Sequence, residues 1–224
     1  MPDRLTEVKP VIGSQLGAVP GSVAVSDADP RLRSRPVEVL APNVLRTSRM
    51  VLRPLRDSDR DGFLAMIAAS RVELDRWVRP HREAESDNQL FERQLQMCKD
   101  GDSRGAAARR VAILEDGRIA GCFNLNSITR GLIFEADFTW WIATDLTGQG
   151  LGTEAAQAML DLAFMDLPRG LGLHRVQAAI HSENTRSLRM AAKLGLVRQP
   201  GATVSILMGD TWQAHDLYAK VING

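Results

Sequence analysis

"LTGQGLGTEA", residues 146–155, is the stretch that decides the fold of this chain, because three alternate glycines stand directly before residues that favour a helix. The glycines are Gly148, Gly150 and Gly152, and Thr153 begins the helix-favouring run. Glycine lets the backbone approach another group closely, and the first amides of a helix leave their N–H groups unpaired. Together these features predict an anion-binding turn at the start of a helix.

The composition is that of an ordinary soluble protein, with 224 residues, 44% hydrophobic and 25% charged. This length allows one domain of moderate size plus an additional segment. A formal net charge of +1 gives no reason to expect nucleic acid as a partner. No run approaches the roughly 18 apolar residues that cross a membrane, and the N-terminus lacks the pattern of a secretory signal. We therefore expect a cytoplasmic protein with no membrane partner.

Cysteine and histidine are sparse and follow no metal-binding pattern. Cys98 and Cys122 lie far apart in the sequence, and the four histidines form neither HxH nor HExxH. We expect free, reduced thiols and no metal.

The first 48 residues differ from the rest of the chain. They hold six of the ten prolines and no aromatic residue, and the first aromatic is Phe63. Such a segment has little to bury, so we predict an extended arm over residues 1–48 and a folded domain over 49–224. Short apolar runs in the arm leave open that it lies on the body of the domain or on a second subunit, as in a homodimer.

Hydrophobic periodicity and turn residues predict an α+β domain. Asp116-Gly117 is the strongest local hairpin pattern, and Asp100-Gly101 is expected to end a helix. The predicted elements are a strand at 49–54, helices at 61–70 and 88–100, a hairpin around 116–117, a strand at 132–143, a helix at 153–165, a strand at 174–180, a helix at 184–195 and a hairpin around 209–210. This order predicts a mixed, mainly antiparallel sheet flanked by helices, with a βαβ crossover at the glycine turn.

The glycine turn has three alternative interpretations. Residues 150–155 fit the loose dinucleotide pattern G-x-G-x-x-G/A, but too little chain follows to complete that fold, and the antiparallel strands before the turn have no place in it. A P-loop is excluded because no GK[ST] is present. A turn that merely begins a helix remains the simplest alternative.

Three stretches in order make the anion-binding interpretation specific: "TWWIATDLTGQGLGTEA" (139–155), "LGLHRVQAAIHSENTRSLRMAAKLGL" (171–196) and "MGDTWQAHDLYAKV" (208–221). Together they resemble the GCN5-related N-acetyltransferase (GNAT) superfamily, in its RimJ/RimL-like branch. The resemblance covers roughly residues 46–222. It implies a GNAT-type sheet, acetyl-CoA as co-substrate, and direct attack of an amine on the thioester without an acyl-enzyme.

The resemblance also implies where acetyl-CoA binds. The family's pyrophosphate loop, Q/R-x-x-G-x-G/A, falls on Thr147, Gly150 and Gly152, so this chain departs from it at the first position. The family's N-x-x-S stretch falls on Asn184 and Ser187, although Asn184 is also a good helix N-cap. The implied cofactor-binding residues are Trp141, Ile142, Ala143, Thr147, Gly148, Gln149, Gly150, Leu151, Gly152, Thr153, Asn184 and Ser187.

The resemblance also implies groups that stabilise the oxyanion and protonate the departing thiolate. A backbone amide at Trp141 or Ile142 is expected to stabilise the oxyanion. Many members protonate the departing thiolate with a tyrosine, but this chain has Ala191 at that position, so Ser187 is the candidate. Its only tyrosine, Tyr218, lies in the last strand.

The general base is harder to place. The glutamate that RimL-like members use falls at Ile206 here. Asp137 matches the acidic position of the family's A-E-I-G-Y-W stretch, and Glu135 lies on the same strand face, so both are candidates. Solvated strand charges are the alternative for both. We expect a structural role for His174 and no catalytic role for His181 or His215.

The acceptor follows only from chemistry. An α-amino group has a pKa of about 8 and lysine one of about 10.4, so an N-terminal amine loses its proton more easily. We expect a protein or peptide N-terminus as acceptor. A small-molecule amine, such as an antibiotic or polyamine, and a catalytically weakened CoA-binding protein stay open. Trp77 is expected to be a core anchor rather than a lid aromatic.

Overall fold

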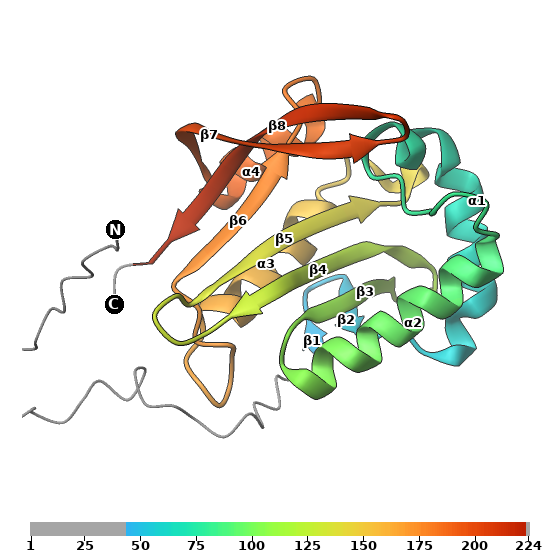
Figure 1. Ribbon diagram of the computed structural model, residues 1–224. Helices are drawn as coiled ribbons and strands as arrows, with labels where there is room; N and C mark the ends of the chain where they lie inside the picture. The colour runs from blue at the N-terminus through green and yellow to red at the C-terminus, as the bar shows by residue number, and fades with distance from the viewer. Residues whose placement is uncertain (1–43, 223–224) are drawn as a thin grey trace, which may run out of the picture. The chain divides into compact units, whose positions relative to one another are not determined.

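Eight strands of the described chain form one sheet in the order β1-β2-β3-β4-β5-β6-β8-β7 (Figure 1). The computed structural model describes residues 44–222. The strands are β1 (Leu45–Arg46), β2 (Met50–Arg53), β3 (Ala108–Leu114), β4 (Ile119–Thr129), β5 (Glu135–Ile142), β6 (Arg175–Ile180), β7 (Val197–Met208) and β8 (Thr211–Val221). The helices are α1 (Arg60–Trp77), α2 (Asp87–Arg104), α3 (Leu151–Phe164) and α4 (Thr185–Leu194), with short 3-10 helices η2 (Asp57–Asp59) and η3 (Thr144–Leu146).

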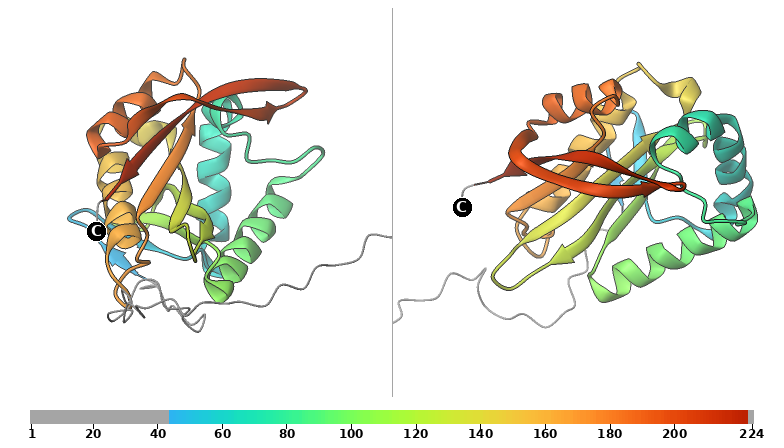
Figure 2. Two further views of the ribbon diagram at one scale, coloured as in Figure 1. Left: turned by 60° about the vertical axis from the view of Figure 1, so that its left-hand side comes forward. Right: turned by 45° about the horizontal axis from the view of Figure 1, so that its top comes forward.

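Helices cover both faces of this sheet. α1 and α2 lie on one face and α3 and α4 on the other, as the two views of Figure 2 show. Only β5 and β6 run parallel, and α3 connects them. The predicted mixed, mainly antiparallel α+β sheet with its βαβ crossover is therefore confirmed. No helix among residues 44–222 is long and apolar enough to cross a membrane.

The buried faces follow the expected periodicities. Every second residue of β6 is buried, namely Val176, Ala178 and Ile180, as in a strand with one face on the core. The predicted hairpin at Asp116-Gly117 joins β3 to β4, and Gly117 has a φ of +86°. Local sequence therefore sets these elements directly.

Two predicted helix ends are wrong. The helix expected over residues 61–70 is α1, which continues to Trp77. The helix expected to end at Asp100-Gly101 continues to Arg104 and ends at Gly105, whose φ is +62°. Gly101 is buried, and a Cβ there would lie 2.9 Å from the Cβ of Ala107. This glycine therefore allows the returning chain to pack closely, and the helix ends one turn later, at the glycine with the left-handed conformation.

The parallel pair β5–β6 separates towards its carboxyl ends. Their pairing ends at Asp137 and Gln177, while β5 continues beside β4 to Ile142 and β6 continues beside β8 to Ile180. Backbone groups on the last residues of β5 therefore lose their sheet partners on the β6 side. Such groups need a ligand or water as a partner, so the opening between the two strands suits a ligand with amide groups.

The N-terminal segment contributes to the sheet earlier than the predicted boundary. Leu45 and Arg46 of β1 pair with Leu52 and Val51 of β2, and Thr47 and Ser48 form the turn between these strands. The rest of the predicted arm, residues 1–43, lies outside the described residues.

Deleting residues 1–43 is expected to change the melting temperature by less than about 3 °C, because that segment has proline throughout and no aromatic residue. Deleting residues 1–48 also removes β1 and is expected to lower it by about 4–8 °C, which corresponds to about 2 kcal/mol for a domain of this size. Differential scanning calorimetry of both deletions measures this. Equal melting temperatures for the two would contradict a stabilising role for residues 44–48.

Candidate active site

The glycine turn joins η3 to α3 and has the conformation that the sequence predicts. Gly148 and Gly150 have φ values of +82° and +79°, a backbone region that side chains disfavour. Gly150 is the N-cap of α3 and supplies no side-chain cap. The first amides of α3 are therefore free of a side-chain partner, as an anion-binding helix start requires.

An arginine and a glutamate far apart in the sequence hold this turn. Arg49 Nη1 donates to the carbonyl of Gln149 at 3.0 Å, and Arg49 Nε donates to Glu154 Oε2 at 2.7 Å. Glu154 Oε1 also accepts from Ser48 Oγ at 2.8 Å. Burial raises the pKa of Glu154, but hydrogen bonds from Thr47, Ser48 and Arg49 outweigh it and lower that pKa to about 2, from an ordinary 4.5. The turn before β2 is thereby fastened to the first turn of α3.

Replacing Glu154 with glutamine is expected to cost about 2–3 kcal/mol of unfolding free energy at pH 7, because a lowered carboxyl pKa stabilises the ionised native state. This contribution is present above about pH 5 and is lost as the pH falls to about 2, since the group then binds a proton in both states. Urea unfolding of both proteins at several pH values measures it. A difference that stayed constant down to pH 2.5 would contradict the ionic role.

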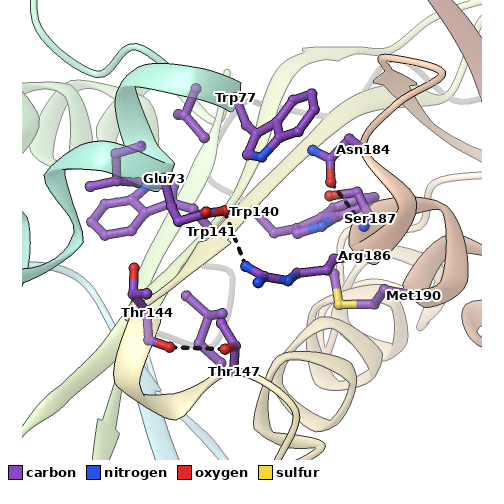
Figure 3. Close-up of a pocket in the computed structure, with 13 residues that line it drawn as sticks. Glu73, Trp77, Trp140, Trp141, Thr144, Thr147, Asn184, Arg186, Ser187 and Met190 are labelled. Carbon is purple, nitrogen blue, oxygen red and sulfur yellow. Dashed lines mark hydrogen bonds and ion pairs between the residues drawn. The ribbon is translucent and has the colours of Figure 1, made fainter.

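A pocket lies at the separated ends of β5 and β6 (Figure 3). Its walls come from the end of α1, the end of β5, the loop that leads to the glycine turn, and the start of α4. Thr144 lines the pocket, and its backbone N–H donates a hydrogen bond of 3.0 Å to Ser70 Oγ. Ser70 is 1% exposed, so the strand end is fixed from inside the core.

Asn184 and Ser187 lie side by side on the α4 wall (Figure 3). Asn184 Oδ1 accepts from the backbone N–H of Ser187 at 3.1 Å, so the asparagine caps α4. The amide nitrogen of Asn184 and the hydroxyl of Ser187 make no hydrogen bond within residues 44–222. Both groups therefore remain available to a ligand in the pocket.

An ion pair connects the two sides of the pocket. Arg186 Nη1 of α4 lies 3.1 Å from Glu73 Oε2 of α1, and Figure 3 shows the pair between the tryptophans and Thr147. Their side chains are 60% and 35% exposed, so the pair adds little stability. The sequence did not predict this pair, because its members stand 113 residues apart.

The structure brings most of the predicted cofactor residues together. Trp141, Ile142, Thr147, Asn184 and Ser187 line the pocket. The others lie in the adjoining turn and the first turn of α3, and Ala143 is buried below the strand end.

Thr147 and Trp77 both line the pocket. Thr147 Oγ1 donates to the carbonyl of Thr144 at 2.8 Å, so its side chain holds the loop between β5 and α3. Trp77 lies 5.9 Å from the ring of His181. It does not belong to the buried hydrophobic core, so the expected role as a core anchor is wrong.

The two predicted carboxylates lie outside this pocket. Asp137 Oδ1 accepts from Gln177 Nε2 at 3.0 Å, and Glu135 lies 3.4 Å from Arg175 Nε. Both lie on β5 before the strands separate, three or more residues from the pocket-lining Trp140. Their role as base stays a prediction.

The family model of the acetyltransferase (GNAT) domain matches residues 49–197. This chain belongs to the GNAT acetyltransferase family. It is 26% identical over 176 residues to the ribosomal protein uS5-alanine N-acetyltransferase of Escherichia coli. The matched region covers 78% of this chain and 89% of that protein. GNAT membership makes the chain an N-acetyltransferase and supports acetyl-CoA as its co-substrate.

Solved GNAT structures share this fold. Mycobacterium smegmatis RimJ in complex with CoA-disulfide matches with a TM-score of 0.70 at 23% identity, over 80% of this chain and 88% of that one. The microcin C7 self immunity acetyltransferase MccE, in complex with acetyl-CoA and AMP, matches with a TM-score of 0.69 at 16% identity, over 82% and 99% of the two chains.

Proposed function

We propose that this acetyltransferase transfers the acetyl group of acetyl-CoA to the N-terminal amine of a protein or peptide. One observation carries the choice of acceptor: within residues 44–222, the only ionisable side chains that line the pocket are Glu73 and Arg186, and they pair with each other. A pocket wall without a free carboxylate suits an amine that loses its proton readily. The uS5-alanine acetyltransferase of E. coli, by its name, acts on such an amine.

The reaction places four demands on the chain. The first amides of α3 and the open turn at Gly148 and Gly150 bind the diphosphate of acetyl-CoA. The unpaired edge of β5 and the amide of Asn184 bind its extended arm. A backbone amide at Trp141 or Ile142 donates to the oxyanion that forms when the amine attacks the thioester carbon. The hydroxyl of Ser187 then gives its proton to the departing CoA sulfur.

A small-molecule amine is the second candidate acceptor. The fold match to MccE supports this candidate, because an acetyltransferase named for self immunity to microcin C7 has the same fold. A weakened CoA-binding protein is the third candidate, because Thr147 replaces the family's long polar residue and turns its hydroxyl back to Thr144.

Thiol release from acetyl-CoA separates the three candidates. The amines are a peptide with a free N-terminal alanine, the same peptide with a blocked N-terminus and an internal lysine, spermidine, and an aminoglycoside. We expect kcat/KM for the free α-amine to exceed that for lysine by about 100-fold at pH 7, following their neutral fractions. Release only with spermidine or the aminoglycoside would replace the proposed acceptor. Tight CoA binding without release from any amine would support the weakened protein.

A further inference from the structure

Two histidines that are more than thirty residues apart in the sequence pack against each other near the pocket. His181 directly follows β6, and His215 lies on β8. Their ring centroids are 5.3 Å apart at an interplanar angle of 69°. His181 also packs 5.9 Å from Trp77, which lines the pocket. Neither histidine lines the pocket itself, and Trp77 connects the pair to it.

The backbone partners of the two rings assign their tautomers. His215 Nδ1 lies 3.0 Å from the carbonyl oxygen of Gln213, which can only accept, so Nδ1 carries the proton. His181 Nδ1 accepts from the backbone N–H of Glu183 at 3.3 Å, so its proton is on Nε2. Of the two rings, only His215 therefore has a free lone pair, on Nε2.

The His215 side chain is largely buried, but its Nε2 is accessible to solvent. The residue is 6% exposed, which restricts the ring to one orientation. Its Nε2 makes no hydrogen bond within residues 44–222, and this atom is not fully buried. The small exposed part of the residue therefore includes the basic nitrogen.

Few charges surround the two rings. Asp216 follows His215 on β8, so its side chain and its partner Arg198 lie on the opposite face. On β7, the residue paired with His215 is the uncharged Val204.

On the remaining sides, α1 contributes Trp77, with Arg76 stacked 4.6 Å from its ring, and β6 leads to His181. No ion pair within residues 44–222 joins either imidazole to a carboxylate.

We propose that His215 is the proton acceptor for the incoming amine, with Nε2 reached through water at the pocket mouth. This rests on the proposed acetyl transfer to an amine and names the group that accepts its first proton. The rival carboxylates are engaged elsewhere: Glu73 with Arg186, Asp137 with Gln177, and Glu135 with Arg175. An imidazole is also the side chain best suited to exchange protons near neutral pH.

The protons of the reaction balance with this assignment. The ammonium gives one proton to His215 Nε2, and the neutral nitrogen attacks the thioester carbon, whose carbonyl opens to an oxyanion. When the oxyanion collapses, the carbon–sulfur bond breaks and Ser187 gives its proton to the sulfur. The nitrogen loses its second proton to restore the Ser187 hydroxyl. The first proton leaves His215 for solvent, so one proton is released for each amide formed.

The test is His215→Asn, because the asparagine amide keeps a donor for the Gln213 carbonyl and removes the basic nitrogen. The readout is the pH profile of kcat/KM from pH 6.5 to 9.5, on whichever amine the wild-type chain acetylates. At pH 6.5 we expect a loss of about 30-fold, within the range of one proton-transfer group. The loss should shrink to less than about 3-fold near pH 9, because the amine then loses its proton in solution. Affinity for CoA and the melting temperature should be unchanged.

Glu73→Gln and Asp137→Asn are the matched variants for the rival bases, and each should change the shape of the profile little. A profile of His215→Asn parallel to that of the wild type would overturn the proposal, even with a lower rate, because a structural role predicts a uniform loss. A pH-dependent loss in Glu73→Gln or Asp137→Asn instead would reassign the base. Absence of acetylation by the wild-type chain on every amine tested would contradict the proposed function, and would do so before any variant is compared.

Discussion

Replacing Gly150 with aspartate is expected to weaken acetyl-CoA binding by about 100-fold or more, because two negative charges about 4 Å apart at a protein surface repel by about 4 kcal/mol. Gly150 caps α3 at a φ of +79°, directly before the amides that we assign to the diphosphate. A Cβ at this position meets only the guanidinium of Arg49, at 3.6 Å, so the added side chain has space and the fold should persist. Isothermal titration calorimetry with acetyl-CoA measures the change.

Two matched variants separate charge from backbone strain. Gly117→Asp introduces the same residue at a φ of +86°, also in open space but in the distant β3–β4 turn, and should leave the affinity unchanged. Gly150→Ala adds the strain at the turn without the charge and should lose far less affinity than the aspartate. Wild-type affinity in Gly150→Asp would remove the glycine turn from the cofactor site.

Replacing Ser187 with alanine is expected to lower kcat by about 100-fold, a typical contribution of one proton donor to a leaving group. The hydroxyl lies in the pocket with no hydrogen bond within residues 44–222, so it is available to the CoA sulfur. The cap of α4 uses the backbone N–H of Ser187, so alanine retains it. Affinity for acetyl-CoA should therefore change by less than about 3-fold, since only the transition-state interaction is removed.

Steady-state kinetics and the dependence of kcat on the thiol leaving group test this role. The variant should be more sensitive than the wild type to the basicity of the departing thiolate, because it no longer protonates the sulfur. Ser205→Ala, on the exposed part of β7, is the control and should retain full activity. An unchanged kcat in Ser187→Ala would exclude the serine as the acid.

Local patterns predicted much of the fold and part of the site. The hairpin at Asp116-Gly117, the glycine turn before α3 and the cap at Asn184 all follow from one short stretch each. The predicted helix end at Asp100-Gly101 was wrong, because α2 continues to Arg104. Gly101 is needed where the chain packs closely against Ala107, and a glycine used for packing looks the same in the sequence as one that ends a helix.

No sequence pattern predicts the contacts of Arg49 with Gln149 and Glu154 that hold the glycine turn. Arg49 and Glu154 stand 105 residues apart, and no spacing rule relates them. Sequence reasoning likewise preferred Glu135 and Asp137 as bases, since they share a strand face with the thioester segment. It could not show that β5 and β6 separate only after Asp137, which leaves both carboxylates beside paired strands and outside the pocket.

Short stretches of sequence predict the order of the elements, the glycine turn before a helix and the resemblance to GNAT enzymes, because each of these depends on residues within a few positions of one another. Which side chains meet depends on the tertiary structure: Glu73 pairs with Arg186 at the pocket, and His181 packs against His215 beside it. Strand pairing and helix packing set these distances. Side chains on separate elements leave no periodicity that links them, so their meeting, and with it the choice of base, appears only when the sheet is assembled.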